Sequence, residues 1–335
     1  MNNDDEKFQP TFIEVCAGAG GLSCGLIKAG FKPLLLNDMD KNCCSTLRVN
    51  HPELSDEQVR CCSLKDLDLS AYVGQVDLLT GGVPCQSFSQ AGKRGGLDDE
   101  RGGLMMSFIE MVNKVKPKIF MIENVKGLMT HNEGETFQTI LNTFDRNHYD
   151  ISYKLMNASK HNVPQKRERI IIIGLLKQLN LSFTFPTESN VVKTVGEALH
   201  NVPPSIGAKY SEEKIELFKQ IPQGGCWIDL DENLQKEYLG KSFYSGGGKR
   251  GILHRLSFDK PSLTLLCSPS QKQTERCHPT EERPLTVREY ARIQTFDDDY
   301  VFTGSMSSQY KQIGNAVPVE MARQIGVELF KALSD

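Results

Sequence analysis

The sequence lacks the features that would indicate a membrane protein, a secreted disulfide-rich protein or a zinc protein. No apolar run approaches the length of a membrane span, and residues 1–10 are too polar and acidic for a secretory signal. The ten cysteines are scattered and form no Cys-x-x-Cys pair. Repeats and low-complexity tracts are absent as well. We therefore expect reduced thiols, no metal site and a cytoplasmic location.

The sequence also has little net charge, −3 at neutral pH, which by itself does not favour nucleic-acid binding. The distribution is more informative, because eight Lys and Arg stand against four Asp and Glu between Lys241 and Arg283. A modest basic segment on an acidic body fits a surface that faces nucleic acid, and it also fits a solvated loop region. Charge alone leaves both interpretations open.

What is present is an alternation of short apolar runs with helical patterns. The predicted strands are 11–16, 33–37, 59–62, 76–80, 118–122, 149–155 and 169–175. This order predicts an α/β fold with a Rossmann-like, doubly wound mixed sheet, mostly parallel. From about Pro186 the sequence becomes rich in Pro, Gly and Ser, which predicts a second, smaller and loop-rich domain. Further along, we expect a helix over 285–296, a tight loop over 312–318 and a final helix over 319–333.

The first predicted strand runs into Ala17-Gly18-Ala19-Gly20-Gly21 and then a helix. Strand, glycine turn and helix form the opening of dinucleotide-type sites, where backbone comes close to a ligand. Ser23 replaces the third glycine of the nicotinamide fingerprint, which argues against a dehydrogenase. Asp38 ends the second strand, where an acid would hold a ribose diol. Asp40 is the alternative, and helix N-capping is the competing interpretation for both acids.

A loop centred on Cys85 follows the fourth predicted strand. Its sequence is Gly81-Gly82-Val83-Pro84-Cys85-Gln86-Ser87-Phe88-Ser89. A free cysteine is usually a small buried thiol, but the glycines, the proline and the polar residues argue against burial here. Seven glycines between Gly81 and Gly103 favour a lid. Glu123 is a second polar group at a strand end, and Arg167 and Arg169 would face the same way on an extended chain.

Six motifs now stand in a fixed order. They are Phe12-x-x-x-Cys16-Ala-Gly-x-Gly-Gly, Pro84-Cys85-Gln86, Glu123-Asn124-Val125, Gln165-x-Arg167-x-Arg169, Arg288-Glu289-x-Ala-Arg292 and Gly314-Asn315-x-Val317. From Phe12 to Val319 the chain closely resembles the S-adenosylmethionine-dependent DNA (cytosine-5)-methyltransferases of the bacterial restriction–modification type. Each motif alone is modest, but the ordered set is a specific signal.

The resemblance implies a division of labour between two domains. A catalytic, S-adenosylmethionine-dependent methyltransferase domain would comprise 1–186 and 305–335. A target-recognition domain would comprise 187–304, with 285–304 as a helical hinge element. The family carries its variable recognition region in this place, and its members flip the target cytosine out of the duplex.

The resemblance also implies a chemistry for the site. Cys85 would add to carbon 6 of cytosine as a thiolate, which makes carbon 5 able to accept a methyl group. Glu123 would share a proton with ring nitrogen 3, a role that burial favours. Arg169 would steady the carbonyl oxygen of the base, and Arg167 would support the same region. The sequence names no base for the final removal of the proton from carbon 5.

Cofactor residues transfer by position from the family, whereas the arginines expected at DNA beyond residue 240 come from the basic composition of the recognition region. The residues expected at S-adenosylmethionine, and at its product S-adenosylhomocysteine, are Cys16, Ala17, Gly18, Ala19, Gly20, Gly21, Asp38, Met39, Ser63, Leu64, Gly82, Pro84, Leu104, Asn315 and Val317. The residues expected at DNA or the target base are Val83, Gln86, Ser89, Arg101, Arg250, Arg255, Thr264 and Leu265. Cys16, Met39 and Ser63 depart from the commonest family pattern at the adenine pocket, where Asp66 could substitute for Ser63.

The family implies an enzyme that acts on double-stranded DNA in a prokaryotic cytoplasm, without a membrane or metal partner, beside a restriction endonuclease that acts separately. We expect a monomer, because the loading of one flipped base needs no partner subunit. The alternative is an RNA (tRNA) cytosine-5 methyltransferase of the same chemistry. The large region that contains Thr264 and Leu265 favours DNA, since the tRNA branch lacks a comparable one. An inactive DNA-binding module is disfavoured, because Cys85, Glu123 and Arg169 are all present.

Overall fold

The structure, a computed structural model, describes residues 8–84, 102–144, 148–244 and 251–334. The chain divides into two compact units. The first comprises residues 1–157, 168–188 and 317–335, and the second comprises 158–167 and 189–316. Sequence analysis had placed the boundaries after residues 186 and 304. The assignment of the two parts to catalysis and to target recognition stays a prediction.

The first unit is built on a seven-stranded sheet with the order β3-β2-β1-β4-β5-β8-β6. The strands are β1 (Thr11–Val15), β2 (Lys32–Asp38), β3 (Val59–Cys61), β4 (Leu78–Gly81), β5 (Ile119–Val125), β6 (Tyr149–Asn157) and β8 (Glu168–Leu176). The first five strands in the sheet order run parallel, and β8 is antiparallel to both β5 and β6. The predicted mixed, mostly parallel sheet is confirmed.

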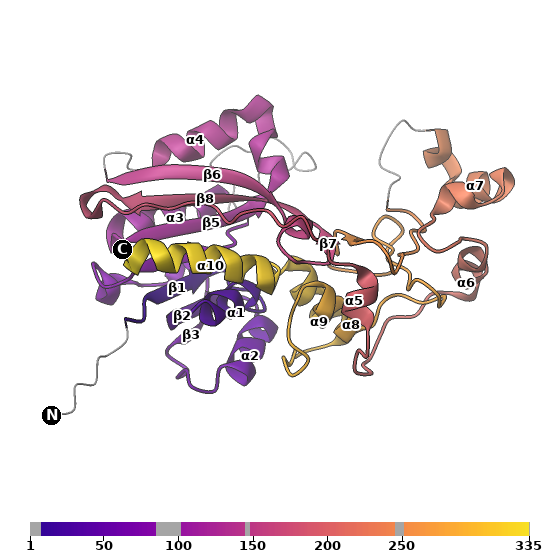
Figure 1. The fold of residues 1–335 in the computed structure, drawn as a ribbon, viewed down its shortest axis with the longest axis horizontal. Coiled ribbons are helices and arrows are strands. Elements are labelled where there is room, and N and C mark those ends of the chain that lie inside the picture. The colour runs from indigo at the N-terminus through magenta and orange to yellow at the C-terminus, as the bar shows by residue number, and fades with distance from the viewer. Residues whose placement is uncertain (1–7, 85–101, 145–147, 245–250, 335) are drawn as a thin grey trace. The chain divides into compact units, whose positions relative to one another are not determined.

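Helices cover both faces of this sheet (Figure 1). They are α1 (Gly21–Lys28), α2 (Lys41–Asn50), α3 (Gly102–Val115), α4 (Glu135–Thr143) and α10 (Val319–Ser334). Side chains alternate along a strand. Ile13 and Val15 of β1 therefore point to the same face and pack into a core with Phe108 of α3 and Phe137 of α4. Glu14 points to the other face, where α1 lies with α10 packed along it.

Two details explain how local sequence fixes this layering. Ile119 to Ile122 of β5 are entirely buried, as a central strand covered on both faces requires. On β8, a Cβ added at Gly174 would lie 2.0 Å from the Phe120 ring. Glycine at this position therefore makes room for that ring between the two strands.

The second unit has short helices and little sheet. Its helices are α5 (Val195–Leu199), α6 (Glu212–Lys219), α7 (Glu232–Leu239), α8 (Val287–Ile293) and α9 (Met306–Asn315), and its strands are β7 (Gln165–Lys166) and β9 (Ser262–Leu263). Its own core includes Leu217, Phe218, Leu253 and Cys277.

The predicted tight loop over 312–318 is wrong in its first half. Residues 312–315 form the last turn of α9, which begins after Ser305, whose hydroxyl accepts from the backbone N–H of Ser308. Gly314 is required there by packing, because a Cβ would lie 2.4 Å from the carbonyl oxygen of Leu266. Gly-Asn pairs are common in turns, but here the neighbouring chain selects glycine inside a helix.

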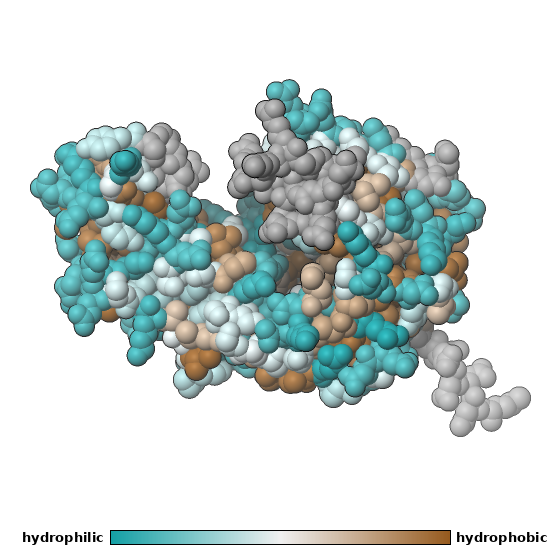
Figure 2. Space-filling view, turned by 180° about the vertical axis from the view of Figure 1, so that it is seen from behind, coloured by the Kyte–Doolittle hydropathy of each residue, from teal (hydrophilic) through white to brown (hydrophobic). Residues whose placement is uncertain are grey.

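On the face drawn in Figure 2, hydrophobic residues form scattered spots among hydrophilic ones. Large exposed apolar side chains include Met39 in the first unit and Ile228 and Tyr244 in the second. None of the helices in the described ranges is both long enough and apolar enough to cross a bilayer.

Candidate active site

The carboxyl ends of β1 and β4 define the place where a ligand is expected. These strands are neighbours, but the chain continues from β1 to β2 on one side and from β4 to β5 on the other. The sheet order therefore reverses between them, and open α/β sheets bind ligands outside such a reversal. The glycine turn leaves β1 at this point, and the segment from Gly82 to Pro84 leaves β4.

The glycine turn has a backbone that few side chains allow. Gly18 and Gly20 have φ values of 57° and 80°, and Cys16 also lies in the left-handed region, at 52°. The N–H of Ala17 donates to the carbonyl oxygen of Asn37 over 2.8 Å, which ties the turn to the end of β2. A non-glycine residue held in this region is strained, and such strain gathers at functional sites.

Asp38, at the end of β2, faces the glycine turn; its predicted contact with a ribose stays a prediction. One carboxylate oxygen accepts from the N–H of Gly18 and the other from the N–H of Asp40, each over 2.8 Å. Burial raises the pKa of Asp38 from its ordinary value. Asp40 instead caps α2 and accepts from the N–H of Asn42. Of the two acids considered, Asp38 is the one that contacts the turn.

Glu14 was not identified from the sequence. It is 1% exposed, and its carboxyl group is hydrogen-bonded to the hydroxyl of Ser23 in the first turn of α1. Burial raises the pKa of Glu14 from 4.5 to about 8, and the negative charges of Asp38 and Glu123 add to the effect. The only signal in the sequence is one acid inside an apolar strand.

Glu123 and Arg169 are brought together by the antiparallel pairing of β5 with β8. Oε1 of Glu123 lies 2.8 Å from Nε of Arg169, with side chains 10% and 13% exposed. The geometry is that of an ion pair rather than an aligned hydrogen bond. A Cβ added at Gly82 would lie 3.6 Å from Oε2 of Glu123. The carboxylate therefore lies beside the backbone that leads from β4 toward Cys85.

Val83 is fixed on both its side chain and its backbone. The side chain is 1% exposed and belongs to the core under α3. Its carbonyl oxygen accepts a hydrogen bond from Nδ2 of Asn124 over 2.9 Å. Pro84, the next residue, is exposed. Val83 is therefore held by its side chain in the core and by its backbone carbonyl, and its side chain is not exposed.

The remaining predicted cofactor residues of the first unit are distributed as follows. Met39 is 71% exposed, whereas Leu64 and Val317 are buried and Leu104 is half-buried. Ser63 caps a short 3-10 turn and accepts from the N–H of Lys65. The segment before Ser63 is held by the Asn37 carboxamide, which donates to two backbone carbonyls over 3.0 Å.

In the second unit, Arg167 lies between β7 and β8, two residues before Arg169; that the two side chains face the same way stays a prediction. Arg167 is 1% exposed and donates to the carbonyl oxygens of Leu265 and Asn315 over 3.2 and 3.3 Å. The side chain of Asn315 is exposed and its Oδ1 lies 2.9 Å from Sγ of Cys267. Arg167 therefore stabilises the loops of this unit.

Two residues expected at DNA lie inside the second unit. Arg255 is 4% exposed, pairs with Glu282 over 3.0 Å and donates to the carbonyl oxygen of Phe218 over 2.6 Å. Leu265 is fully buried. A direct contact of either side chain with DNA would require these interactions to be exchanged. Thr264 is half-buried, and its hydroxyl donates to the carbonyl oxygen of Lys166.

Five predicted site residues lie outside the described ranges. They are Cys85, Gln86, Ser89, Arg101 and Arg250. Within the described ranges, no group of three or more His, Cys, Asp or Glu side chains is arranged to hold a metal ion.

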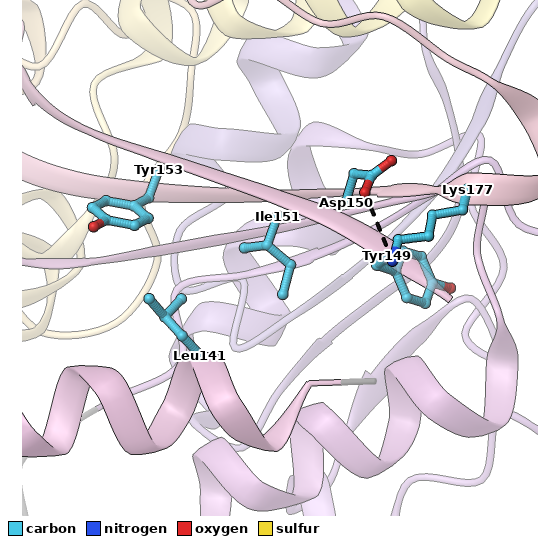
Figure 3. A pocket seen from close by; sticks show the side chains of 6 residues that line it. All are labelled: Leu141, Tyr149, Asp150, Ile151, Tyr153 and Lys177. Atoms are coloured by element: carbon cyan, nitrogen blue, oxygen red, sulfur yellow. Dashed lines mark ion pairs between the residues drawn. The ribbon is translucent and has the colours of Figure 1, made fainter. Parts of the chain in front are cut away.

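A separate hollow of about 300 Å³ lies at the other end of the sheet (Figure 3). It is lined by Leu141, Tyr149, Asp150, Ile151, Tyr153 and Lys177. Tyr149 begins β6 and pairs with Leu176 at the end of β8, whose neighbour Leu175 pairs with Ile119 at the start of β5. This hollow is therefore at the amino ends of the parallel strands, away from Asp38 and Glu123.

Comparisons with known proteins agree with this geometry. A family model described as C-5 cytosine-specific DNA methylase matches residues 10–331. The Type II methyltransferase M.Eco47II of Escherichia coli is 48% identical over 94% of this chain and 78% of its own length, and M.Sau96I of Staphylococcus aureus is 46% identical over 96% and 76%. The solved structure of Spodoptera frugiperda DNMT2 shares the fold, with a TM-score of 0.69 at 16% identity over 98% of this chain and all of that one.

Proposed function

The chain belongs to the C-5 cytosine-specific DNA methylase family and is a DNA (cytosine-5-)-methyltransferase, and from this we propose that Cys85 bonds covalently to carbon 6 of a flipped-out cytosine during methyl transfer. The observation that carries the proposal is the buried pair of Glu123 and Arg169 beside Gly82. The acid and the cation of this pair therefore lie where the segment that leads to Cys85 begins.

The chemistry explains why these residue types are needed. Carbon 5 of cytosine is a poor nucleophile. A bond from Sγ of Cys85 to carbon 6 would make the ring an enamine, whose carbon 5 can attack an electrophilic methyl group. Glu123 would share a proton with ring nitrogen 3 as charge develops there, and Arg169 would hold Glu123 and the base. Loss of the proton from carbon 5 then expels the thiolate and restores the free enzyme.

The residues at the end of β1 and β2 fit S-adenosylmethionine, which would supply a methyl group on a sulfonium. Among the described residues other than its two chain neighbours, no atom lies within 4 Å of the position where Gly18 would carry a Cβ, so the turn borders open space there. The helix that follows would place N–H groups near a carboxylate, and the half-buried Asp38 could accept hydrogen bonds from a ribose diol. S-adenosylhomocysteine would remain after the transfer.

The biological setting is proposed from the relatives, which are named Type II methyltransferases. The protein would methylate one sequence in double-stranded DNA as a monomer in a prokaryotic cytoplasm, with a restriction endonuclease acting separately. The second unit would select the sequence. Its basic stretch from Lys241 to Arg283 supports a surface that faces phosphate.

The test is to trap the covalent intermediate. Sequencing methylated cytosines in DNA from cells that express the protein gives the target site. A duplex of that site with 5-fluorocytosine at the target should form an adduct with the enzyme and S-adenosylmethionine that survives denaturation, because the proton on carbon 5 is replaced. Cys85→Ser should form none, whereas Cys61→Ser, an exposed thiol of β3, should react as wild type.

Absence of an adduct with wild-type enzyme that still methylates DNA would refute the role of Cys85. Methylation of tRNA but not of DNA would establish the alternative substrate.

A further inference from the structure

Two thiols contact each other beside the acid that holds the glycine turn. Cys44 lies on α2 and is fully buried, whereas Cys61 is the last residue of β3 and is exposed. Their side chains are hydrogen-bonded to each other. Sγ of Cys44 also donates to the carbonyl oxygen of Asp38 over 3.3 Å, and Sγ of Cys61 lies 4.0 Å from that of the next residue, Met39. Both sulfurs thus lie against two consecutive peptide groups at the end of β2.

The backbone fixes the positions of both cysteines. In the parallel pairing of β2 with β3, Asp38 lies opposite Cys61. Asp40 caps α2 directly after β2, and its carbonyl oxygen accepts from the N–H of Cys44 over 3.0 Å. The contact between the thiols is therefore set by a strand pairing and by the first turn of a helix.

We propose that Cys44 and Cys61 are a modification site, at which a peroxide produces a disulfide that weakens the binding of S-adenosylmethionine. A sulfur in a disulfide has no proton, so Cys44 would no longer donate to the carbonyl oxygen of Asp38. The new bond would also draw α2 toward β3, because a disulfide brings its two sulfurs to about 2 Å. The inference rests on the proposed function in one respect, since it takes Asp38 as the contact to the ribose.

Exposure decides the order of the chemical steps. Hydrogen peroxide reaches Cys61 first, because Cys44 is buried, and burial also raises the pKa of the Cys44 thiol, which keeps it protonated. The thiolate of Cys61 attacks one oxygen of the peroxide, breaks the O–O bond and becomes a sulfenic acid as hydroxide leaves. Sγ of Cys44 then bonds to the sulfur of Cys61, and the hydroxyl leaves with the Cys44 proton as water. Two thiols and one peroxide thus give one disulfide and two molecules of water.

The first measurement identifies the bond. The full-length protein is reduced, treated with hydrogen peroxide, alkylated, digested with trypsin without reduction and analysed by mass spectrometry. Peptides 42–48 and 61–65 should appear joined, and a thiol reductant should separate them. Each peptide holds two cysteines, so variants decide which sulfurs are bonded. Cys44→Ala and Cys61→Ser should each abolish the cross-link, whereas Cys62→Ser, which changes the half-buried neighbouring thiol, should form it as wild type does.

The second measurement gives the consequence for the cofactor. Isothermal titration calorimetry with S-adenosylhomocysteine compares reduced and oxidised protein and requires no turnover. Oxidation of wild type should weaken binding about 5- to 10-fold, the factor that corresponds to the loss of one hydrogen bond. A thiol reductant should restore the affinity. Cys61→Ser should bind as reduced wild type does, before and after peroxide, which separates this effect from oxidation of other thiols.

Two results would overturn the inference. One is the absence of the cross-link in wild type at peroxide in excess over protein thiols, and the other is a complete cross-link with unchanged affinity. Should Cys44→Ala not fold, Cys61→Ser decides, because its position is exposed.

Failure of the proposed function gives a different result. Reduced wild type that does not bind S-adenosylhomocysteine would refute the cofactor assignment, and the effect on binding would fall with it. The cross-link is detected by mass and does not depend on that assignment.

Discussion

Oε1 of Glu123 lies 2.8 Å from Nε of Arg169 across the antiparallel strands β5 and β8, with both side chains nearly buried. Removal of one partner from a buried ion pair leaves an uncompensated charge and commonly costs more than the pair contributed. The two residues should therefore act as a unit, in structure as well as in catalysis.

Glu123→Gln should lower turnover about 100- to 1,000-fold, because the variant keeps the shape of the side chain but cannot share a proton with the base. Binding of the target duplex should change little, as measured by fluorescence anisotropy. Glu168→Gln is the matched control, since Glu168 forms an exposed pair with Lys126 over 3.0 Å, and its turnover should stay at the wild-type value. Equal losses of binding and turnover in Glu123→Gln would mean that Glu123 serves structure alone.

Asp38→Ala should weaken binding of S-adenosylmethionine and S-adenosylhomocysteine about 10- to 100-fold, because it removes a carboxylate that holds the turn and would hold the ribose. Isothermal titration calorimetry measures both constants. Asp40→Ala should instead destabilise α2 by about 1 kcal/mol through loss of its cap and leave cofactor affinity unchanged. The reverse pattern would transfer the ribose contact to Asp40.

The raised pKa of Glu14 predicts a pH dependence of stability. The folded state holds this proton up to about pH 8, whereas the unfolded chain releases it near 4.5. Between these values the folded state binds more protons, so its stability falls as pH rises. The melting temperature of wild type should therefore drop relative to that of Glu14→Gln between pH 5 and 8.5. Glu216→Gln, which changes an exposed position on α6, is the control, and its melting temperature should drop with pH as that of wild type does. Parallel curves of wild type and Glu14→Gln would contradict the raised pKa of Glu14.

At Gly25, α1 packs tightly on α10, since a Cβ there would lie 2.4 Å from Cβ of Ala322 and 2.7 Å from the carbonyl oxygen of Val319. Gly25→Ala should lower the free energy of unfolding by about 1–3 kcal/mol through overpacking. Gly127→Ala is the control, because no atom of the described residues, its two chain neighbours apart, lies within 4 Å of its Cβ position. Chemical denaturation of both variants compares them, and equal stability would show that the helices can separate at no cost.

Exchange of residues 187–283 for the matching region of a relative should move the methylated sequence to that of the relative. Bisulfite sequencing of a plasmid from expressing cells gives the answer directly. The first unit, with Asp38 and Glu123, is kept in the hybrid, so methylation itself should persist. Methylation at the original site would place recognition elsewhere in the chain.

Sequence reasoning was most successful where one strand or helix carries its own pattern. The final helix, expected over 319–333, is α10 (Val319–Ser334), and the order of apolar runs predicted the mostly parallel sheet. Prediction from sequence failed where contact with a segment distant in the chain determines the local structure. Gly314 resembled a turn residue, but Leu266 requires it inside α9, and helices α6 and α7 were hidden in a region rich in loop-forming residues.

The candidate site divides in the same way. Glu123 and Asp38 could be located, because strand ends and motif order mark them. Glu14 could not, since its partner Ser23 lies across the glycine turn and only the folded chain reveals the contact. Arg255 was expected to face DNA because it is charged, but Glu282 and backbone carbonyls surround it. The sequence shows the charge of a residue but not which residues contact it in the fold.

The reversed direction of β8 has a consequence for how this enzyme can change. An antiparallel strand begins at the edge of the sheet where the parallel strands end. Arg169 is therefore the second residue of β8, and not part of a loop, when it contacts Glu123. The ladder between β5 and β8, and not the connection of some forty residues between them, sets the distance of that pair. Changes of length in the connection between β5 and α4 would therefore leave the acid beside its cation, whereas α4 and β6 are constrained by the core and by the sheet.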